Sequence, residues 1–240
     1  MNIVMPMAGR GSRFAQIGIE TPKPLIPVRG KPMYAWATDG LPLAMARQLI
    51  FICLAEHLAE RALEQDICSR YAAYDPQIVA LDHVTEGQAC TVLCAKQYID
   101  NADPLLIFNA DTYAATTLAA ALKAFPPGVA GVLDVFRAEG DKWSFARADD
   151  QGRVLETAEK QRISEWATTG LYYFSRGSDF VRHAEAMIAD NDRSGNEFYV
   201  APLYNRLIRE GADVRINPVE QVWVLGTPED LAHFEREYHG

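Results

Sequence analysis

Short, continuous apolar runs separated by helix-length segments are the feature that most constrains the fold of this chain. The runs lie at residues 2–7, 48–54, 77–81 and 104–109. Strands of this composition are buried on both faces, which is typical of a parallel sheet. The intervening segments at 33–46, 56–71 and 88–99 are predicted to be helices, so strand and helix alternate through the first 110 residues. This order predicts an α/β fold in which helices cover both faces of the sheet.

The second half of the chain has a different order of elements. Strands are predicted at residues 128–136, 144–148, 154–158 and 168–174, followed by helices at 178–189 and 198–210, a pair of strands at 213–216 and 222–225, and a last helix. The last helix should begin with Thr227 as its N-cap and Pro228 in its first turn. Because the 240 residues contain no linker or repeat, we expect a single Rossmann-like domain, residues 1–240, with a mostly parallel mixed sheet.

Composition excludes several classes of partner. A net charge of −9 argues against broad nucleic-acid binding. No apolar stretch approaches the roughly 20 residues of a membrane-spanning helix, and no export signal is recognisable, so a cytoplasmic location is expected. The cysteines and histidines lack the spacing of a zinc site. Basic residues are nevertheless concentrated near the N-terminus, where five cations face the single acid Glu20, and this concentration suits a small polyanion.

The first apolar run ends in a glycine-rich segment, Ala8-Gly9-Arg10-Gly11-Ser12-Arg13. Glycines let a backbone turn sharply, so that successive N–H groups can converge on phosphate oxygens. The segment lacks the Gly-Lys-Ser/Thr of a Walker A loop, and Phe14 stands where a Rossmann motif has its third glycine. By itself, such a segment is more often an arginine-bearing surface turn.

Two cations favour a phosphate site instead. Arg13 can bind phosphate through a bidentate fork. Lys23 stands between Pro22 and Pro24, which restrict the backbone and are expected to hold the lysine in an extended segment.

Together with these residues, motifs along nearly the whole chain resemble the sugar-nucleotide pyrophosphorylases, which are nucleotidyltransferases. The motifs are Pro22-Lys23-Pro24, Gly30-Lys31-Pro32-Met33, Thr85-Glu86-Gly87, Asn109-Ala110-Asp111, Glu159-Lys160, Thr169-Gly170-Leu171-Tyr172 and Gly226-Thr227-Pro228-Glu229-Asp230-Leu231. The appearance is that of short members from bacterial capsule and surface-polysaccharide clusters. The resemblance implies a GT-A-like fold with a nucleotide-binding half, residues 1–111, and an acceptor-binding half, residues 112–240. It is also compatible with a homo-oligomer.

The resemblance further implies a reaction and a set of site residues. A small phosphomonoester would attack the α-phosphorus of an NTP, and pyrophosphate would leave. Arg13, Lys23 and Asp111 would be catalytic, with Asp111 also binding Mg²⁺. Nucleotide binding would fall to Ala8, Gly9, Arg10, Gly11, Ser12, Thr85, Glu86, Gly87, Gln88 and Asn109. Acceptor binding would fall to Glu159, Lys160, Gly170 and Glu197.

The second metal carboxylate is where this sequence departs from the family pattern. Relatives often carry an aspartate two residues before the glycine of Gly-Thr-Pro, where this chain has Val224. Either Asp111 acts with water and phosphate alone, or Glu220 or Glu197 substitutes, or activity is impaired. We favour the first because the other phosphate-binding groups are intact, and Mg²⁺ needs only one or two carboxylates beside phosphate.

Several functions remain open at this stage. The favoured one is a nucleotidyltransferase that uses a pyrimidine nucleotide (CTP, UTP or dTTP) and a sugar 1-phosphate or small phosphorylated alcohol, for surface-polysaccharide biosynthesis. A regulatory module that binds nucleotide with impaired turnover is the alternative that Val224 raises. A nicotinamide-dependent oxidoreductase is disfavoured by the missing third glycine.

Overall fold

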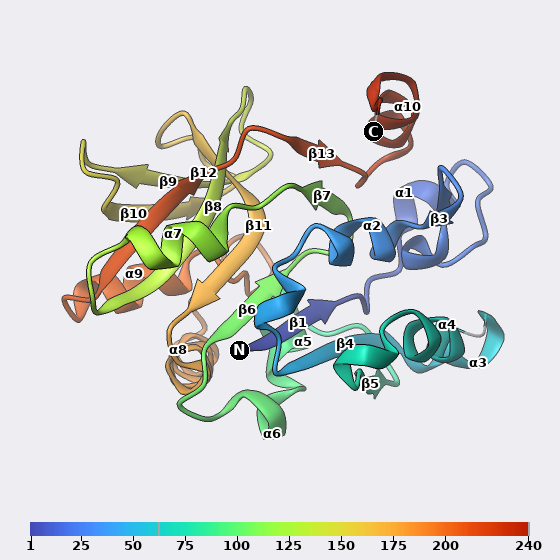
Figure 1. The fold of residues 1–240 in the computed structure, drawn as a ribbon, viewed down its shortest axis with the longest axis horizontal. Coiled ribbons are helices and arrows are strands. Elements are labelled where there is room, and N and C mark those ends of the chain that lie inside the picture. The colour runs from blue at the N-terminus through green and yellow to red at the C-terminus, as the bar shows by residue number, and fades with distance from the viewer. Residues whose placement is uncertain (62, 240) are drawn as a thin grey trace.

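A nine-stranded mixed sheet lies at the centre of the computed structural model, which describes residues 1–61 and 63–239 (Figure 1). Its strands are β1 (Asn2–Pro6), β4 (Gln48–Leu54), β5 (Gln77–Leu81), β6 (Leu105–Phe108), β8 (Val129–Arg137), β9 (Ser144–Ala148), β10 (Val154–Glu159), β11 (Trp166–Phe174) and β12 (Asp213–Pro218). The order is β10-β9-β11-β6-β1-β4-β5, with β8 beside both β11 and β12. Pairing is parallel among β5, β4, β1 and β6 and between β12 and β8, and it is antiparallel around β11 and β9.

Both faces of the sheet are buried at its central parallel strands β1, β4 and β6, which is why these strands are continuous apolar runs. Side chains alternate between the faces, so Val4 of β1 belongs to one core while Ile3 and Met5 belong to the other. The first core packs against α5 (Gln88–Leu93), α6 (Lys96–Ile99), α8 (Gly177–Ala189) and α9 (Leu203–Arg209). The second packs against α2 (Met33–Asp39), α4 (Leu63–Arg70) and α7 (Leu118–Ala124), while α3 (Ala55–Arg61) follows β4. The predicted single α/β domain with a mixed sheet and helices on both faces is therefore confirmed.

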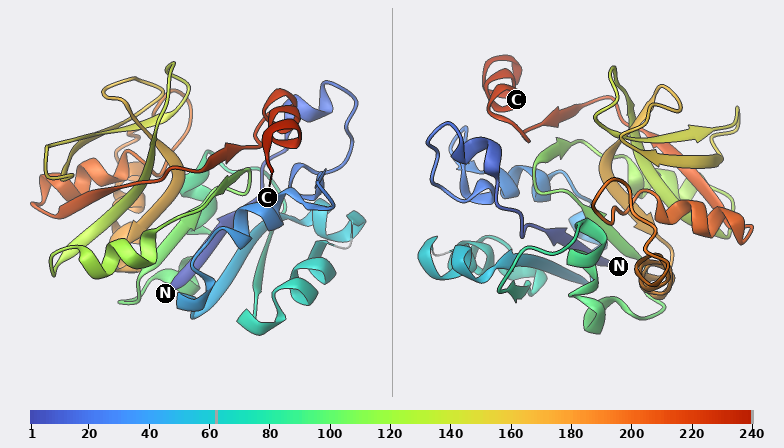
Figure 2. Two further views of the ribbon diagram at one scale, coloured as in Figure 1. Left: turned by 45° about the horizontal axis from the view of Figure 1, so that its top comes forward. Right: turned by 180° about the vertical axis from the view of Figure 1, so that it is seen from behind.

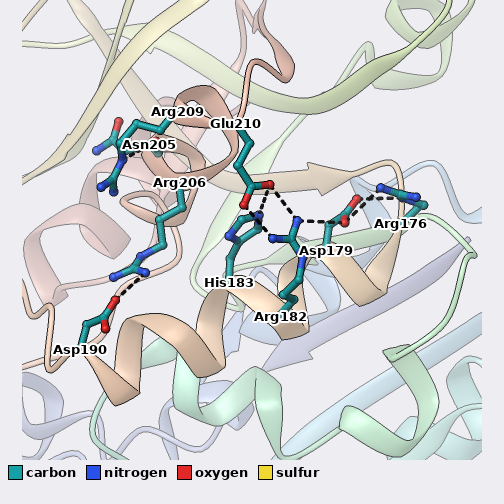
Figure 3. A network of polar contacts seen from close by, with 9 residues as sticks. All are labelled: Arg176, Asp179, Arg182, His183, Asp190, Asn205, Arg206, Arg209 and Glu210. Atoms are coloured by element: carbon teal, nitrogen blue, oxygen red, sulfur yellow. Dashed lines mark hydrogen bonds and ion pairs between the residues drawn. The ribbon is translucent and has the colours of Figure 1, made fainter.

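Polar contacts join α8 to α9 on the outside of the first core (Figure 3). Arg182 of α8 makes two hydrogen bonds to Glu210, at 2.7 and 2.9 Å. His183 is buried beside them, with its Nε2 3.5 Å from a Glu210 carboxylate oxygen, and burial lowers the pKa of this histidine. Arg206 of α9 donates to Asp190 at 2.8 Å. This network accounts for much of the charge on the surface of these two helices, and it lies away from the cleft described below.

Two short ribbons lie outside the central sheet, and the C-terminal helix packs on the N-terminal segment. One ribbon pairs β7 (Thr112–Ala114) with β13 (Val222–Val224), and the other pairs β2 (Pro27–Val28) with β3 (Lys31–Pro32). Helix α10 (Pro228–Glu237) then packs Phe234 near Phe14 of α1 (Ser12–Ala15) in a third apolar cluster. Arg29 ties the two segments together by donating to the carbonyls of Glu235 and Tyr238 at 3.1 and 2.7 Å. Figures 1 and 2 show α10 beside α1 in different views.

Several predicted boundaries differ from the observed ones for tertiary reasons. The helix predicted at 33–46 ends at Asp39, because Gly40 packs so closely on the Ala114 carbonyl that a Cβ there would lie 2.5 Å from the oxygen. The helix predicted at 88–99 is two helices, α5 and α6. The helix predicted at 198–210 begins only at Leu203, because the backbone of Phe198 is bonded to the loop at residue 86. The segment at 222–225 pairs with β7 rather than with the strand at 213–216.

Two further predictions concern chain segments rather than boundaries. The helix expected at 56–71 is described as α3 and α4, and residue 62 between them lies outside the described residues. The capping prediction for the last helix is confirmed, because Thr227 Oγ1 accepts a hydrogen bond from the Asp230 N–H at 3.1 Å. Among the described helices, none combines the length and hydropathy needed to cross a bilayer.

Candidate active site

A cleft of about 620 Å³ opens at the carboxyl ends of β1 and β6. Ligands of open α/β sheets bind at such edges. Arg13, Lys23 and Asp111, which the sequence assigns to catalysis from three separate motifs, all line this cleft. The three side chains therefore share one space, as a common role in catalysis requires.

The glycine-rich loop links β1 to α1, and Ala8 and Gly9 of this loop line the cleft. Gly11 adopts the left-handed conformation (φ 62°, ψ 35°) as the residue before α1, and a Cβ on Gly11 would lie 2.7 Å from the Cβ of Lys23. Glycine at this position thus admits the lysine as well as the turn. Within the described residues, the backbone N–H groups of residues 9–11 donate no hydrogen bond, so they remain available to an anion.

The predicted residues of this loop do not all reach the cleft. Ala8, Gly9 and Arg13 line it, whereas Arg10, Gly11 and Ser12 lie outside the described lining. Arg13 is exposed, so its guanidinium is available to a bound phosphate.

Lys23 reaches Asp111 directly. Its Nζ lies 2.5 Å from Asp111 Oδ2, and it sits 6.0 Å from the centre of the Phe14 ring. The expectation of an extended lysine was wrong, because Lys23–Leu25 forms a 3₁₀ turn after an extended Pro22. Pro24 fits the first turn of such a helix because its missing N–H would be unpaired there in any case.

Asp111 follows β6 and is held from two sides. Its carbonyl accepts a hydrogen bond from the Leu225 N–H at 2.8 Å, and a Cβ on Gly226 would lie 3.3 Å from its Oδ2. Asp111 is not the N-cap of the next helix, because the residue preceding α7 is Thr117. Contact with Lys23 uses Oδ2 and leaves Oδ1 without a hydrogen bond among the described residues.

Other carboxylates are distributed unevenly around this position. Val224 lines the cleft, as does Asp230, an acidic residue in the first turn of α10 that was not predicted as a site residue. Glu197 lines the cleft in the part that also holds Glu159, whereas Glu220 lies outside its described lining. No group of three or more metal-binding side chains occurs among residues 1–61 and 63–239. Asp111 therefore stands as a single carboxylate beside a cation.

The loop predicted to bind the base is packed against the segment predicted to bind the acceptor. Gly87 has φ 134°, and a Cβ there would lie 2.5 Å from both the N and the O of Phe198. Two backbone hydrogen bonds of 2.9 Å join Phe198 to Glu86 and Ala89. The glycine thus admits another part of the chain, and not only a base.

Thr85, Gly87, Gln88 and Asn109 line the cleft, whereas Glu86 forms an ion pair with Arg193 outside the described lining. The Gln88 side-chain amide donates to Asn109 Oδ1. Gly170, at φ 88°, makes room for Asn109, because a Cβ on this glycine would lie 2.3 Å from the asparagine Nδ2.

The acceptor end of the cleft holds a chain of hydroxyl and carboxyl groups. Ser144 donates to Glu159 Oε2, and burial raises the pKa of this glutamate. Tyr172 is within 3.1 Å of the Thr168 hydroxyl, and burial raises the pKa of the tyrosine to about 12. At pH 7 the tyrosine is therefore a neutral hydrogen-bonding group.

A second set of contacts involves the predicted acceptor residues Lys160 and Glu197. Lys160 donates to the Tyr199 hydroxyl at 2.5 Å, and Tyr199 in turn donates to Glu197. Glu197 and Tyr199 line the cleft, whereas Lys160 lies outside the described lining and reaches it through the tyrosine.

Lys142 and Trp143 are among the lining residues that no sequence motif indicated. Trp143 enters the cleft just before β9, and the Lys142 ammonium lies 4.6 Å from the centre of its ring. Both belong to the connection between β8 and β9. No motif marked them, because only the pairing of these strands brings their connection to the cleft.

The chain has an α/β fold in which the residues predicted to bind phosphate follow the strands of the parallel half and line one cleft. The chain belongs to the nucleotidyl transferase family, whose sequence profile matches residues 2–239. It is thus a nucleotidyltransferase, as its motifs predicted.

Relatives and solved structures agree with this assignment. The chain is 25% identical over 232 residues to a glucose-1-phosphate thymidylyltransferase of Xanthomonas campestris pv. campestris, a match covering 93% of this chain and 75% of that protein. It is 25% identical over 240 residues to a 2-aminoethylphosphonate cytidylyltransferase of Lancefieldella rimae, covering 99% of this chain and 93% of that protein. The crystal structure of a nucleoside-diphosphate-sugar pyrophosphorylase from Vibrio cholerae RC9 superimposes with a TM-score of 0.85 at 29% identity, covering 98% of this chain and 100% of that one.

Proposed function

We propose that this nucleotidyltransferase joins a nucleotidyl group from an NTP to a small phosphorylated acceptor in the cleft. An acceptor phosphate oxygen attacks the α-phosphorus, the bond from that phosphorus to the bridging oxygen breaks, and pyrophosphate leaves. The observation that carries the proposal is that Arg13, Lys23 and Asp111 line one cleft. Little covalent chemistry is required of the protein in such a transfer, so positioning and charge neutralisation are its main tasks.

Each cation has a distinct part in the proposal. Lys23 is held by Asp111 at 2.5 Å, and this contact directs its ammonium to the place where the reacting phosphates would bind. Arg13 is exposed on α1 and offers its guanidinium fork to the departing pyrophosphate. The free N–H groups of the loop at residues 9–11 supply further donors to the triphosphate.

Asp111 fits a magnesium ion as a single protein ligand. Mg²⁺ is bound in many phosphoryl-transfer sites by one or two carboxylates together with phosphate oxygens and water. Asp111 Oδ1 is the oxygen left for this purpose, because Oδ2 accepts from Lys23. When bound, the ion would neutralise charge on the phosphate oxygens. Asp230 is the other carboxylate near the glycine of Gly-Thr-Pro that lines the cleft.

The substrates are proposed from the lining and from the relatives. Thr85, Gln88 and Asn109 offer amide and hydroxyl groups to a base edge, and we assign a pyrimidine because the two curated relatives described above are thymidylyl- and cytidylyltransferases. Glu159 and Glu197 lie where an acceptor would carry hydroxyl or amino groups. The acceptor class is a sugar 1-phosphate or a small phosphorylated alcohol, and its activated product suits surface-polysaccharide synthesis.

The two substrates are assigned to consecutive halves of the chain. In the proposal, residues 1–111 bind the nucleotide and residues 112–240 bind the acceptor. The contacts of Phe198 with the loop at residues 86–89 then connect the two halves.

One assay tests the proposal. The protein is incubated with MgCl₂, one of CTP, UTP, dTTP, ATP or GTP, and one of a panel of sugar 1-phosphates and phosphorylated alcohols, and pyrophosphate is measured. Release that requires both substrates and is largest with a pyrimidine nucleotide is the expected result. Tight NTP binding without release in any combination would instead support the regulatory alternative that Val224 raises.

A further inference from the structure

A buried carboxylate outside the cleft has no role in the chemistry described above. Asp134 lies in the middle of β8, is fully buried, and forms no ion pair among the described residues. Burial raises its pKa to about 6, so at pH 8 the side chain is ionised in a place that disfavours charge. Packing alone does not call for an acid here, because a neutral side chain would fill the same space without that cost.

The contacts of Asp134 lead to the ribbon that carries Asp111. Its Oδ1 accepts from the side-chain amide of Asn217 at 2.7 Å, and the two residues are direct neighbours in the β8–β12 ladder. The amide oxygen of Asn217 accepts in turn from the Thr117 hydroxyl at 3.1 Å. Asn217 stands near the end of β12, shortly before β13, and Thr117 stands shortly after β7. The asparagine therefore joins the two chain segments that lead to the ribbon of β7 and β13.

The paired strands of the ribbon connect these hydrogen bonds to the cleft. At its near end, the Ala115 N–H donates to the Gln221 carbonyl at 3.1 Å. Its paired strands then run to the other end, where the Leu225 N–H donates to the carbonyl of Asp111 at 2.8 Å. A change in how the near end is held can thus alter the placement of Asp111 without any direct contact.

The ionised state of the acid determines how the link is made. A carboxylate only accepts hydrogen bonds, so Asn217 must turn its NH₂ group to Asp134 and its carbonyl oxygen to Thr117. A neutral amide at position 134 both donates and accepts, so it would allow either orientation of the Asn217 amide. In one of these, the Thr117 hydroxyl loses its acceptor.

We propose that Asp134 is a positioning residue, which orients Asn217 onto Thr117 and thereby holds the β7–β13 ribbon, and with it Asp111, in place. For its effect on catalysis, this inference rests on the function proposed above. The proposed effect of Asp134 on the ribbon is independent of that function.

Hydrogen exchange on the full-length protein without ligands tests the inference directly. Asp134→Asn and Thr117→Val each disturb one step of the link, and the second removes only a hydroxyl. Thr157→Val is the control for the loss of a threonine hydroxyl that donates to an oxygen, here the carbonyl of Ala201 at 2.7 Å, far from the ribbon in the chain; Thr157 is buried, whereas Thr117 is exposed. Exchange at pH 8 is followed in peptides that contain Ala115 and Leu225 and in a reference peptide from β11.

Thr117→Val should exchange the ribbon amides about fivefold faster, as expected for the loss of one hydrogen bond, and Asp134→Asn should exchange them faster by a smaller factor, because a flipped Asn217 amide still pairs with the Thr117 hydroxyl, while β11 is unchanged in both. The control should leave the ribbon unchanged. A merely structural role would accelerate exchange throughout the molecule or not at all. Unchanged ribbon exchange in both test variants, or equal acceleration in β11, would overturn the inference.

Kinetics then connect the ribbon to the reaction. With a substrate pair that the wild type uses, Asp134→Asn should raise the half-saturating Mg²⁺ concentration or lower kcat several-fold, with the acceptor KM unchanged. A raised acceptor KM alone would contradict positioning through Asp111. Should the wild type release no pyrophosphate with any pair, the proposed function fails, and the exchange experiment still decides the inference about Asp134.

Discussion

Removing the charge of Lys23 tests the centre of the proposed mechanism. Lys23→Met keeps the aliphatic stem that packs against Gly11 and deletes only the ammonium group. A hydrogen bond to a charged group contributes about 1.5–3 kcal/mol. If one such bond to the reacting phosphates is lost, kcat/KM should fall by about 10- to 150-fold, since about 1.4 kcal/mol corresponds to a factor of ten.

Folding should be affected much less than catalysis. The Lys23–Asp111 pair is partly open to solvent, with 21% and 31% of the two side chains exposed. Pairs near the surface contribute about 0.2–1 kcal/mol to stability. We therefore expect the urea midpoint of the variant to remain close to that of the wild type.

Lys31 provides a matched control. It pairs with Asp39 at 2.6 Å with similar exposure, 25% and 40%, but lies outside the described lining of the cleft. Pyrophosphate release is measured at low substrate concentration for Lys23→Met, Lys31→Met and the wild type. The reasoning is refuted if Lys23→Met keeps more than half of the wild-type kcat/KM, or if Lys31→Met loses as much as Lys23→Met.

Three further substitutions probe other parts of the structure. Gly87→Ala should lower stability and raise both the NTP and the acceptor KM, because a Cβ would lie 2.5 Å from the Phe198 backbone that joins the two loops; calorimetry and steady-state kinetics measure this. Glu159→Gln should raise the acceptor KM by about tenfold and leave the NTP KM unchanged, because it weakens hydrogen bonds to the acceptor only; an unchanged acceptor KM would remove Glu159 from the site. The raised pKa of Asp134, about 6 against about 4 unfolded, means that the folded state binds this proton more tightly, so stability contributed by the group falls as pH rises from about 4 to 6. Urea unfolding should therefore show the wild type losing about 3 kcal/mol relative to Asp134→Asn across that range, and a constant difference would contradict the linkage.

The two experiments on Asp134 predict effects of opposite sign for the same variant, one on the local stability of the ribbon and one on the global stability of the protein. At pH 8, Asp134→Asn should be more stable than the wild type while its ribbon exchanges faster. A residue kept only for packing would not give this combination, because local opening would then follow global stability. A trade of stability for positioning is typical of groups that support an active site.

Much of the parallel half of the fold could be predicted from the sequence, because its signals are local. Each buried strand is a continuous apolar run, and the residues that follow β1 and β6 reach the same edge by the rule of parallel strands. Arg13 and Asp111 could be brought together for this reason alone, although almost 100 residues separate them. Lys23 was assigned to the same site by resemblance, and its backbone conformation was predicted wrongly.

Pairings that join distant segments could not be predicted in the same way. The strands β7 and β13 have only three residues each, and an apolar run of that length does not specify its partner. The loop that carries Trp143 reaches the cleft because β8 and β9 both pair with β11. The sequence of the loop alone does not predict that its residues line the cleft.

The glycines of the predicted site show which features a local sequence signal can predict and which depend on contacts between distant segments. Gly11, Gly87 and Gly170 were assigned to the site from the sequence, and in the structure each of them has a close neighbour. The neighbours are Lys23, the Phe198 backbone and Asn109, which are other parts of the predicted site rather than a ligand. These glycines therefore organise the site before any nucleotide arrives, which lowers the cost of ordering it during the reaction. Gly9 differs, because nothing in the described structure lies within 4 Å of where its Cβ would be, so the loop is open at this position, where the proposal puts a phosphate.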